Sequence, residues 1–223
     1  MIKHETLIFF KHLTANNSKA WFDENRKRYE EAKANFIEVN QQIINGLAVL
    51  DDGIAQAQLE AKKTMTRINR DIRFSKDKSP YNTFFFSMMA KSGRKGPHVG
   101  YYLSISNEGS FLGAGLYKPD GPTLNKVRQE IDYNLEEWED IVNDPKLQTT
   151  FGEVQTTGSL TRPPKGFEKD NPALKWLKMK DYHVKCPLSN EEVLSNDFAQ
   201  KAVEHLGHAK PLNEFINRVF TVD

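Results

Sequence analysis

The sequence contains very little cysteine and no long hydrophobic run. Its single cysteine, Cys186, excludes an internal disulfide and a zinc cage built from several thiolates of one chain. No window approaches the roughly 18 apolar residues of a membrane span, and the first residues lack the pattern of a signal peptide. We therefore expect a soluble protein of a reduced, cytoplasmic compartment that has no membrane partner.

Sequence patterns for cofactors, metals and catalytic nucleophiles are also missing. Gly113 and Gly115 lack the third spaced glycine of a dinucleotide-binding turn, and no nucleophile-elbow pattern is present. The six histidines are scattered, and no carboxylate pattern completes a metal site. They are His4, His12, His98, His183, His205 and His208. We expect neither a cofactor nor a metal, and the sequence leaves open whether the protein is an enzyme.

Aromatic residues, in contrast, are plentiful. They make up 11% of the 223 residues, and the 14 phenylalanines outnumber tyrosine and tryptophan together. This is too much core material for a disordered chain, and the length suits one domain. We expect a single α+β domain over residues 1–223.

Hydrophobic periodicity predicts helices at both ends of the chain and strands in the middle. Helices are expected at residues 6–13, at 18–50, from Thr123 to about 143, at 172–178, and twice after Ser195-Asn196. Strands are expected at residues 65–74, 83–90, 99–106, 110–117 and 182–186. The connections between the middle strands are too short for parallel crossovers. The predicted fold is an antiparallel β-meander of about four to five strands packed with N-terminal and C-terminal helices.

The net charge of +1 is distributed unevenly along the chain. Residues 62–95 contain ten lysines and arginines but only two aspartates, a net charge of +8, so the remaining residues carry −7. This asymmetry suggests an anionic partner for the basic segment. Neutralisation by acidic helices elsewhere in the fold explains it equally well.

Alternation along the expected strand 65–74 places Arg70 on an otherwise apolar face, where a guanidinium needs a carboxylate or an anionic ligand. Its apolar neighbours there are Ile68, Ile72 and Phe74. The opposite face places Arg67 and Arg73 beside Asp71, a cluster able to bind phosphate or carboxylate through forked donors. Residues 75–81 would follow as an exposed loop. An anion site and a structural ion network both remain open interpretations.

Residues Arg70 to Tyr81 (RDIRFSKDKSPY) resemble the signature of the family called domain of unknown function 2461. Further blocks that fit this family are Asn16-Asn17 with Trp21-Phe22, Gly113-Ala114-Gly115, Arg128 with Ile131, and Arg162 to Phe167 (RPPKGF). The resemblance runs from about Leu7 to Phe220. It implies a widespread, mostly bacterial protein of about this size, and it supplies no activity, substrate or catalytic residue.

The leading hypothesis is a site for a small phosphate- or carboxylate-bearing ligand in a cleft beside the sheet. The candidate binding residues are Arg67, Arg70, Arg73, Lys76, Lys78, Arg162 and Lys165. Asp71, Asp77 and Tyr81 are the candidates for positioning the ligand or transferring protons. The basic turn around Arg162 either closes over this anion or is merely a loop made rigid by its prolines.

Two alternatives remain beside this hypothesis. One is nucleic-acid binding through the same basic segment, with Tyr81 and residues 84–86 available for stacking. The other is a non-catalytic interaction module in which the motif acts as a structural lock. The sequence does not predict an oligomeric state.

Overall fold

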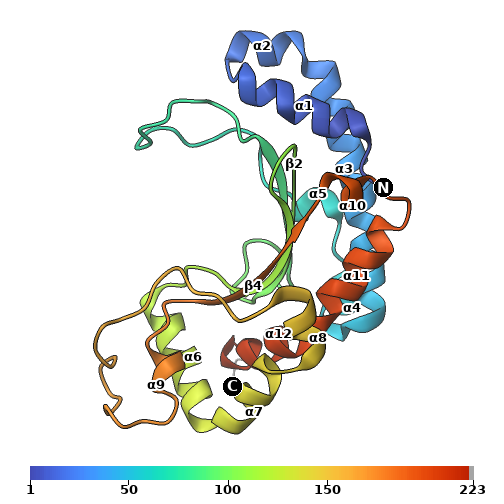
Figure 1. Ribbon diagram of the computed structural model, residues 1–223. Helices are drawn as coiled ribbons and strands as arrows, with labels where there is room; N and C mark the ends of the chain where they lie inside the picture. Colours follow the sequence, from blue (N-terminus) through green and yellow to red (C-terminus); the bar gives the residue numbers. More distant parts are fainter. Residues whose placement is uncertain (221–223) are drawn as a thin grey trace.

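A four-stranded antiparallel sheet forms the centre of the computed structural model, which describes residues 1–220. The strands lie side by side in chain order, β1-β2-β3-β4 (Figure 1). Their bounds are β1 Phe84–Met89, β2 Gly100–Ser106, β3 Ser110–Leu116 and β4 Tyr182–Leu188. A loop of residues 90–99 joins β1 to β2 and a short turn joins β2 to β3, whereas β4 pairs with β3 after a long connection that contains α6 to α9. The predicted α+β fold with an antiparallel meander is confirmed.

Helices from both ends of the chain cover one face of this sheet. The N-terminal helices are α1 His4–Ala15, α2 Lys19–Glu24, α3 Arg26–Leu50, α4 Asp52–Ala57 and α5 Ala61–Thr64. Between β3 and β4 lie α6 Gly121–Tyr133, α7 Leu135–Val142, α8 Pro145–Phe151 and α9 Leu174–Leu177. After β4 come α10 Asn190–Leu194, α11 Phe198–His208, α12 Lys210–Asn217 and the 3-10 turn η1 Arg218–Phe220. Figure 1 shows α3 and α11 to the right of the sheet, whose other face, on the left, remains open.

The hydrophobic core lies between the sheet and these helices. Phe85 illustrates the packing, because its ring lies 4.7 Å from that of Phe10 in α1 and 5.1 Å from that of Phe36 in α3. Alternate residues of the neighbouring strands, including Leu103 and Leu112, are fully buried on the same side. The opposite side chains of each strand therefore form the open face.

Polar side chains divide the helices more finely than periodicity predicted. Ser18 caps α2 as expected, with its Oγ accepting from the Trp21 N–H at 3.3 Å. The expected helix 18–50 is interrupted at Asn25, which separates α2 from α3. The helix predicted to start at Thr123 is capped by Asp120 and interrupted at Asn134. An apolar stripe continues across such breaks, so periodicity alone does not detect them.

The strand predicted at residues 65–74 is wrong. This segment contributes only two isolated bridges, Met65 with Ser87 and Asn69 with Tyr81. At the second bridge and beyond it the chain leaves the sheet as a long projecting segment, here called the Arg70 loop (residues 67–80) (Figure 1). The apolar face expected around Arg70 does not form, because the Phe74 side chain is 95% exposed.

Candidate ligand-binding site

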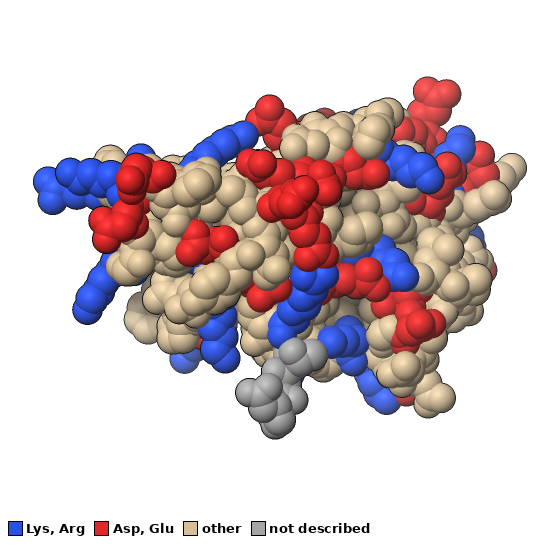
Figure 2. Space-filling model, turned by 90° about the horizontal axis from the view of Figure 1, so that it is seen from below, with Lys and Arg blue, Asp and Glu red and all other residues tan. Residues whose placement is uncertain are grey.

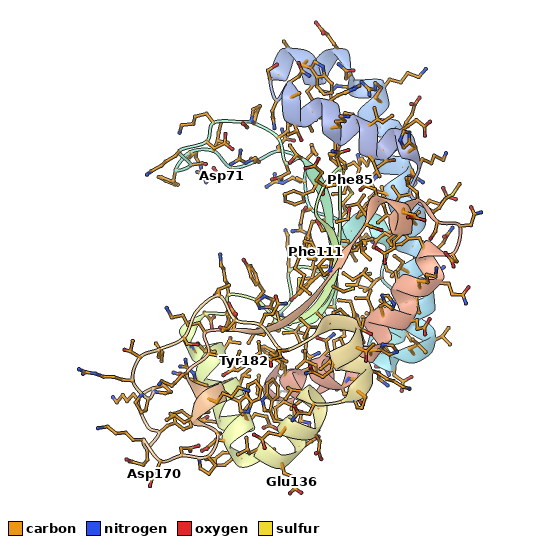
Figure 3. All side chains as sticks on the ribbon, viewed as in Figure 1. Asp71, Phe85, Phe111, Glu136, Asp170 and Tyr182 are labelled. Carbon is orange, nitrogen blue, oxygen red and sulfur yellow. The ribbon has the colours of Figure 1, made fainter. Side chains whose placement is uncertain are left out.

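The open face of the sheet carries a large groove. Its volume is about 1110 Å³, and we call it the open-face groove. Five aromatic side chains from three strands and the segment that follows β3 line it: Phe84, Phe86, Tyr102, Phe111 and Tyr117. Figure 3 shows Phe111 on this side of the sheet and Phe85 on the helix side. The sheet thus presents an aromatic surface that its own helices do not cover.

Strand register brings the groove residues next to one another. Phe86 and Phe111 both flank Ser104, and their ring centroids are 6.4 Å apart. Phe86 also stacks on Tyr102 at 5.8 Å. Lys185 of β4 places its Nζ 4.2 Å from the centroid of the Phe111 ring. The groove therefore combines flat apolar surface with a cation, and both are available to a ligand.

A buried carboxylate lies behind the groove wall at the start of β4. Asp181 is fully buried, and its Oδ1 accepts from the Thr157 backbone N–H at 2.8 Å while its Oδ2 accepts from the Thr157 hydroxyl. The Nδ1 atom of His183 lies 3.3 Å from Asp181 Oδ1, off the direction of a hydrogen bond. His183 lines the groove, and its ring packs edge-on against Tyr117. Burial lowers the pKa of His183, and the Asp181 carboxylate opposes that effect.

Arg70, the centre of the predicted anion site, is paired within its own loop. Its Nη1 donates to Asp77 Oδ2 at 2.5 Å and to the Ser79 carbonyl at 3.0 Å, while Nη2 donates to Ser75 Oγ at 3.4 Å. The side chain is 25% exposed, so it is half-buried and not part of an apolar core. Hydrogen bonds from the Ser79 backbone and side chain, followed by that of Arg70, lower the pKa of Asp77 to about 2. Arg70 and Asp77 thus hold the shape of the loop.

The other charged residues of the Arg70 loop are exposed. Arg73 forms a forked pair with Asp71, at 2.9 Å from Nε and 2.7 Å from Nη2, and this pairing lowers the pKa of Asp71. Lys78 donates to the Ile72 carbonyl at 3.0 Å. Arg67 and Lys76 form no side-chain hydrogen bond or ion pair within residues 1–220, so their donors are available to a ligand.

Tyr81 is buried, contrary to the expectation of an exposed loop up to this residue. Its ring stacks on Phe22 with centroids 4.0 Å apart and an interplanar angle of 16°. The Asn17 side chain pairs with both main-chain polar groups of Tyr81. The proton-transfer role proposed for Tyr81 stays a prediction, and the position of the residue is that of an anchor for the Arg70 loop.

Arg162 and Lys165 lie on a second exposed loop. Figure 1 shows this loop, beside α9, well apart from the Arg70 loop and on the other side of the open sheet face. No hydrogen bond or ion pair joins the two loops within residues 1–220. Figure 2 views the molecule from below, onto the helices at the lower end of Figure 1, and shows acidic side chains over the middle of that underside and basic ones at its left edge. The predicted basic residues thus lie on two rims, not in one cluster.

The architecture is that of an α+β protein whose antiparallel sheet is covered by helices on one face and grooved on the other. The chain belongs to the family of conserved hypothetical proteins DUF2461, whose model matches residues 5–215. No curated protein and no solved structure matches the chain. Within residues 1–220, no helix is long and apolar enough to cross a membrane, and no cluster of three metal-ligating side chains occurs.

Sequence reasoning missed Asp181, His183 and Lys185. The signal was available in part, because alternation within the expected strand 182–186 places His183 and Lys185 on the face opposite Tyr182 and Val184. The role of Asp181 depends on Thr157, which is 24 residues away in the chain. No local spacing reveals such a contact.

Proposed function

We propose that this protein binds a small anionic ligand that carries a flat ring, and that the open-face groove is the binding site. The observation that carries the proposal is the group of partly exposed aromatic side chains on a sheet face that no helix of residues 1–220 covers. Contiguous apolar surface of this kind is uncommon on a protein unless something binds there. Pockets for small molecules have the same composition, a mainly apolar wall with a few polar groups.

The cations beside the groove favour an anion. The groove lining holds one cation, Lys185, and one acid, Glu108. Four further cations that have no side-chain partner within residues 1–220 lie on the two loops beside the open face: Arg67, Lys76, Arg162 and Lys165. Arg70, Arg73 and Lys78 already donate hydrogen bonds within their loop. They therefore contribute positive electrostatic potential and hold the shape of the loop more than they offer free hydrogen-bond donors. Because screening acts over about 8 Å at physiological salt, rim cations steer a ligand and Lys185 is the one that contacts it.

Matched ligands test the two parts of this proposal. Thermal unfolding is measured with three ligands. Inorganic phosphate supplies the anion alone, adenosine supplies the ring alone, and adenosine 5′-monophosphate supplies both. A ligand at about 100 times its Kd adds roughly 2.7 kcal/mol, or about 5–10 °C in Tm for this chain length. We expect the monophosphate to raise Tm more than either part alone. Equal effects of phosphate and monophosphate would contradict a role for the aromatic surface.

Phe111→Ala identifies the site, because this ring lies at the centre of the groove beside Lys185. The matched control is Tyr133→Ala, which removes an aromatic ring that is 79% exposed on α6 and is not part of the groove lining. We expect the first variant to lose the shift given by the monophosphate and the second to keep it. Loss in both variants, or in neither, would place the ligand elsewhere.

Single-stranded nucleic acid is a second candidate ligand, and Phe74 favours it. Its ring is 95% exposed at the end of the Arg70 loop, with the Arg73 guanidinium 5.8 Å away. Exposed rings interleaved with cations suit base stacking and backbone contact. A short oligonucleotide would then bind with an affinity that falls steeply between 50 and 200 mM salt, and Phe74→Ala would weaken it.

The remaining predictions concern setting and mode of action. The cytoplasmic location, the bacterial distribution and the possibility of catalysis stay predictions. If no anion and no oligonucleotide changes the Tm, that result would favour the interaction-module hypothesis, with the Arg70 loop as a structural lock.

A further inference from the structure

Asp181 and His183 stand apart from the other charged residues of the protein. The Asp181 carboxylate is fully buried, and no lysine or arginine among residues 1–220 pairs with it. Isolated buried charges are costly, so such a carboxylate needs donors that compensate for lost hydration. Thr157 supplies two donors, and the His183 Nδ1 atom lies 3.3 Å from Asp181 Oδ1 without forming a hydrogen bond to it. Burying the Asp181 carboxylate at the wall of a groove costs free energy. This cost indicates a role for Asp181 beyond joining the Thr157 segment to the start of β4.

The geometry fixes which nitrogen of His183 is available. Nδ1 is buried on the Asp181 side, whereas the ring as a whole lines the open-face groove. An ionised carboxylate only accepts hydrogen bonds, so it favours the tautomer that carries its proton on Nδ1. The other nitrogen, Nε2, then has a free lone pair on the groove side. The same logic operates wherever a buried carboxylate orients a histidine base.

We propose that Asp181 and His183 form a proton-acceptor site for a hydroxyl group of a ring-bearing ligand in the groove. The inference rests on the proposed function and adds the chemical class of the ligand, an alcohol or phenol. In the transfer step the ligand O–H bond breaks and a new N–H bond forms at Nε2. The electron pair stays on the ligand oxygen, and the imidazolium that results faces the Asp181 carboxylate. His183 touches the ligand, and Asp181 acts through it as a positioning residue.

The charged and titratable groups around His183 fit this role. Asp181 favours the protonated ring, whereas burial and Lys185 favour the neutral ring. Lys185, two residues further along the same strand face, is a cation suited to an oxygen that has lost its proton. Tyr117 is a further titratable neighbour and packs edge-on against the imidazole with ring centroids 5.2 Å apart.

The first test is a long-range ¹H–¹⁵N spectrum of the histidine rings in the whole, ligand-free protein. We expect His183 to be neutral at pH 8 with the proton on Nδ1 and none on Nε2. His98 is an internal control, because it lines the same groove and its Nδ1 has no hydrogen-bond partner. His183→Asn assigns the signals. A proton on Nε2 of neutral His183 would overturn the proposal, and this result needs no variant that must fold.

The second test uses phenol as the probe and anisole as its control, since anisole keeps the ring and lacks the O–H donor. We expect phenol to shift the Nε2 signal of His183 and to bind roughly 3–10-fold more tightly than anisole, as one hydrogen bond allows. His183→Asn should make the two affinities equal. Equal binding of phenol and anisole to the unmodified protein would overturn the hydroxyl site. The two proposals can fail separately. If Phe111→Ala keeps the Tm shift given by the monophosphate while phenol still binds at His183, only the proposal that the groove binds anions is contradicted.

Asp181→Asn tests the positioning role with a readout that a merely structural contact would not change. The carboxylate raises the pKa of His183, so its removal should lower that pKa further while leaving the His98 titration unchanged. An unchanged His183 pKa in a folded Asp181→Asn variant would remove Asp181 from the mechanism.

Discussion

The side chain of Asn17 pairs with the main chain of Tyr81, 64 residues away. Its Nδ2 donates to the Tyr81 carbonyl at 2.9 Å, and its Oδ1 accepts from the Tyr81 N–H at 3.1 Å. This is the pattern that a neighbouring strand would provide. The turn between α1 and α2 is thereby joined to the end of the Arg70 loop, and two blocks of the family resemblance meet in space.

Asn17→Ala removes both hydrogen bonds and leaves two main-chain groups of a buried residue without partners. Leaving a buried polar group without a hydrogen bond costs more stability than one hydrogen bond contributes net. We therefore expect a loss of about 1–3 kcal/mol in the free energy of unfolding. Urea denaturation measures it. Asn16→Ala is the control, because the Asn16 amide only donates to the His12 carbonyl on the surface. A loss no larger than that of the control would show that Asn17 does not anchor the loop.

Arg70→Ala is expected to loosen the Arg70 loop without unfolding the protein. The guanidinium ties three parts of the loop, at Ser75, Asp77 and Ser79, but it is partly exposed and contributes little to the core. Hydrogen exchange should rise several-fold for amides of residues 71–79 and stay unchanged in the sheet. Arg67→Ala, which removes a guanidinium that has no side-chain partner within residues 1–220, should change neither region. Global unfolding of the Arg70→Ala variant would contradict this prediction and would show that Arg70 stabilises the whole fold.

Asp77 should titrate at an unusually low pH. Because its pKa in the folded protein is about 2, against an ordinary 3.8, the charged form stabilises the loop above that range. This stabilisation is lost as the pH falls through the folded-state pKa. Carboxyl NMR should show a midpoint near 2 for Asp77. Arg70→Ala should raise it only part of the way to 3.8, because the Ser79 hydrogen bonds remain. A midpoint at 3.8 in the unmodified protein would contradict the loop geometry.

Gly115 should not tolerate a side chain. Its φ of +97° is unfavourable for other residues, and an added Cβ would lie 2.4 Å from the Tyr182 carbonyl oxygen. Its N–H donates to Asn213 and its carbonyl accepts from the Tyr102 hydroxyl, so the backbone is held on both sides. We expect Gly115→Ala to cost at least about 2 kcal/mol in urea denaturation. Gly121→Ala, which meets no atom within 4 Å, should be nearly neutral.

The strands were predictable because most of their information is local. Alternation located β1, β2 and β3 to within a residue or two, and short turns gave their antiparallel order. The segment 65–74 shows the limit of this reasoning. It alternates like a strand, but apart from the isolated bridges of Met65 and Asn69 it forms only scattered main-chain hydrogen bonds, such as those from Thr66 to Phe86 and from Arg70 to Pro80. Those partners lie far away in the sequence, so alternation cannot reveal them.

The candidate site was less predictable than the fold. The sequence drew attention to Arg70 because an arginine among apolar residues is conspicuous, yet its partners Asp77 and Ser79 lie in the same loop. The groove depends on strand register, which brings Phe86, Phe111 and Lys185 together across three strands. Register and the absence of a covering helix are properties of the whole fold, and no short stretch of sequence encodes them.

His183 and Asp181 should affect the acid sensitivity of the protein in opposite directions. The folded-state pKa of His183 is lowered by burial, so the unfolded chain binds its proton more readily, and stability is lost as the pH falls through about 6.5. His183→Asn removes this contribution, and the free energy of unfolding should then depend less on pH between 7 and 5. Asp181→Asn should make the dependence steeper, because the carboxylate no longer raises the pKa of His183. Urea denaturation at several pH values measures both slopes. Slopes that change in the same direction in the two variants would show that the carboxylate and the imidazole do not act on each other.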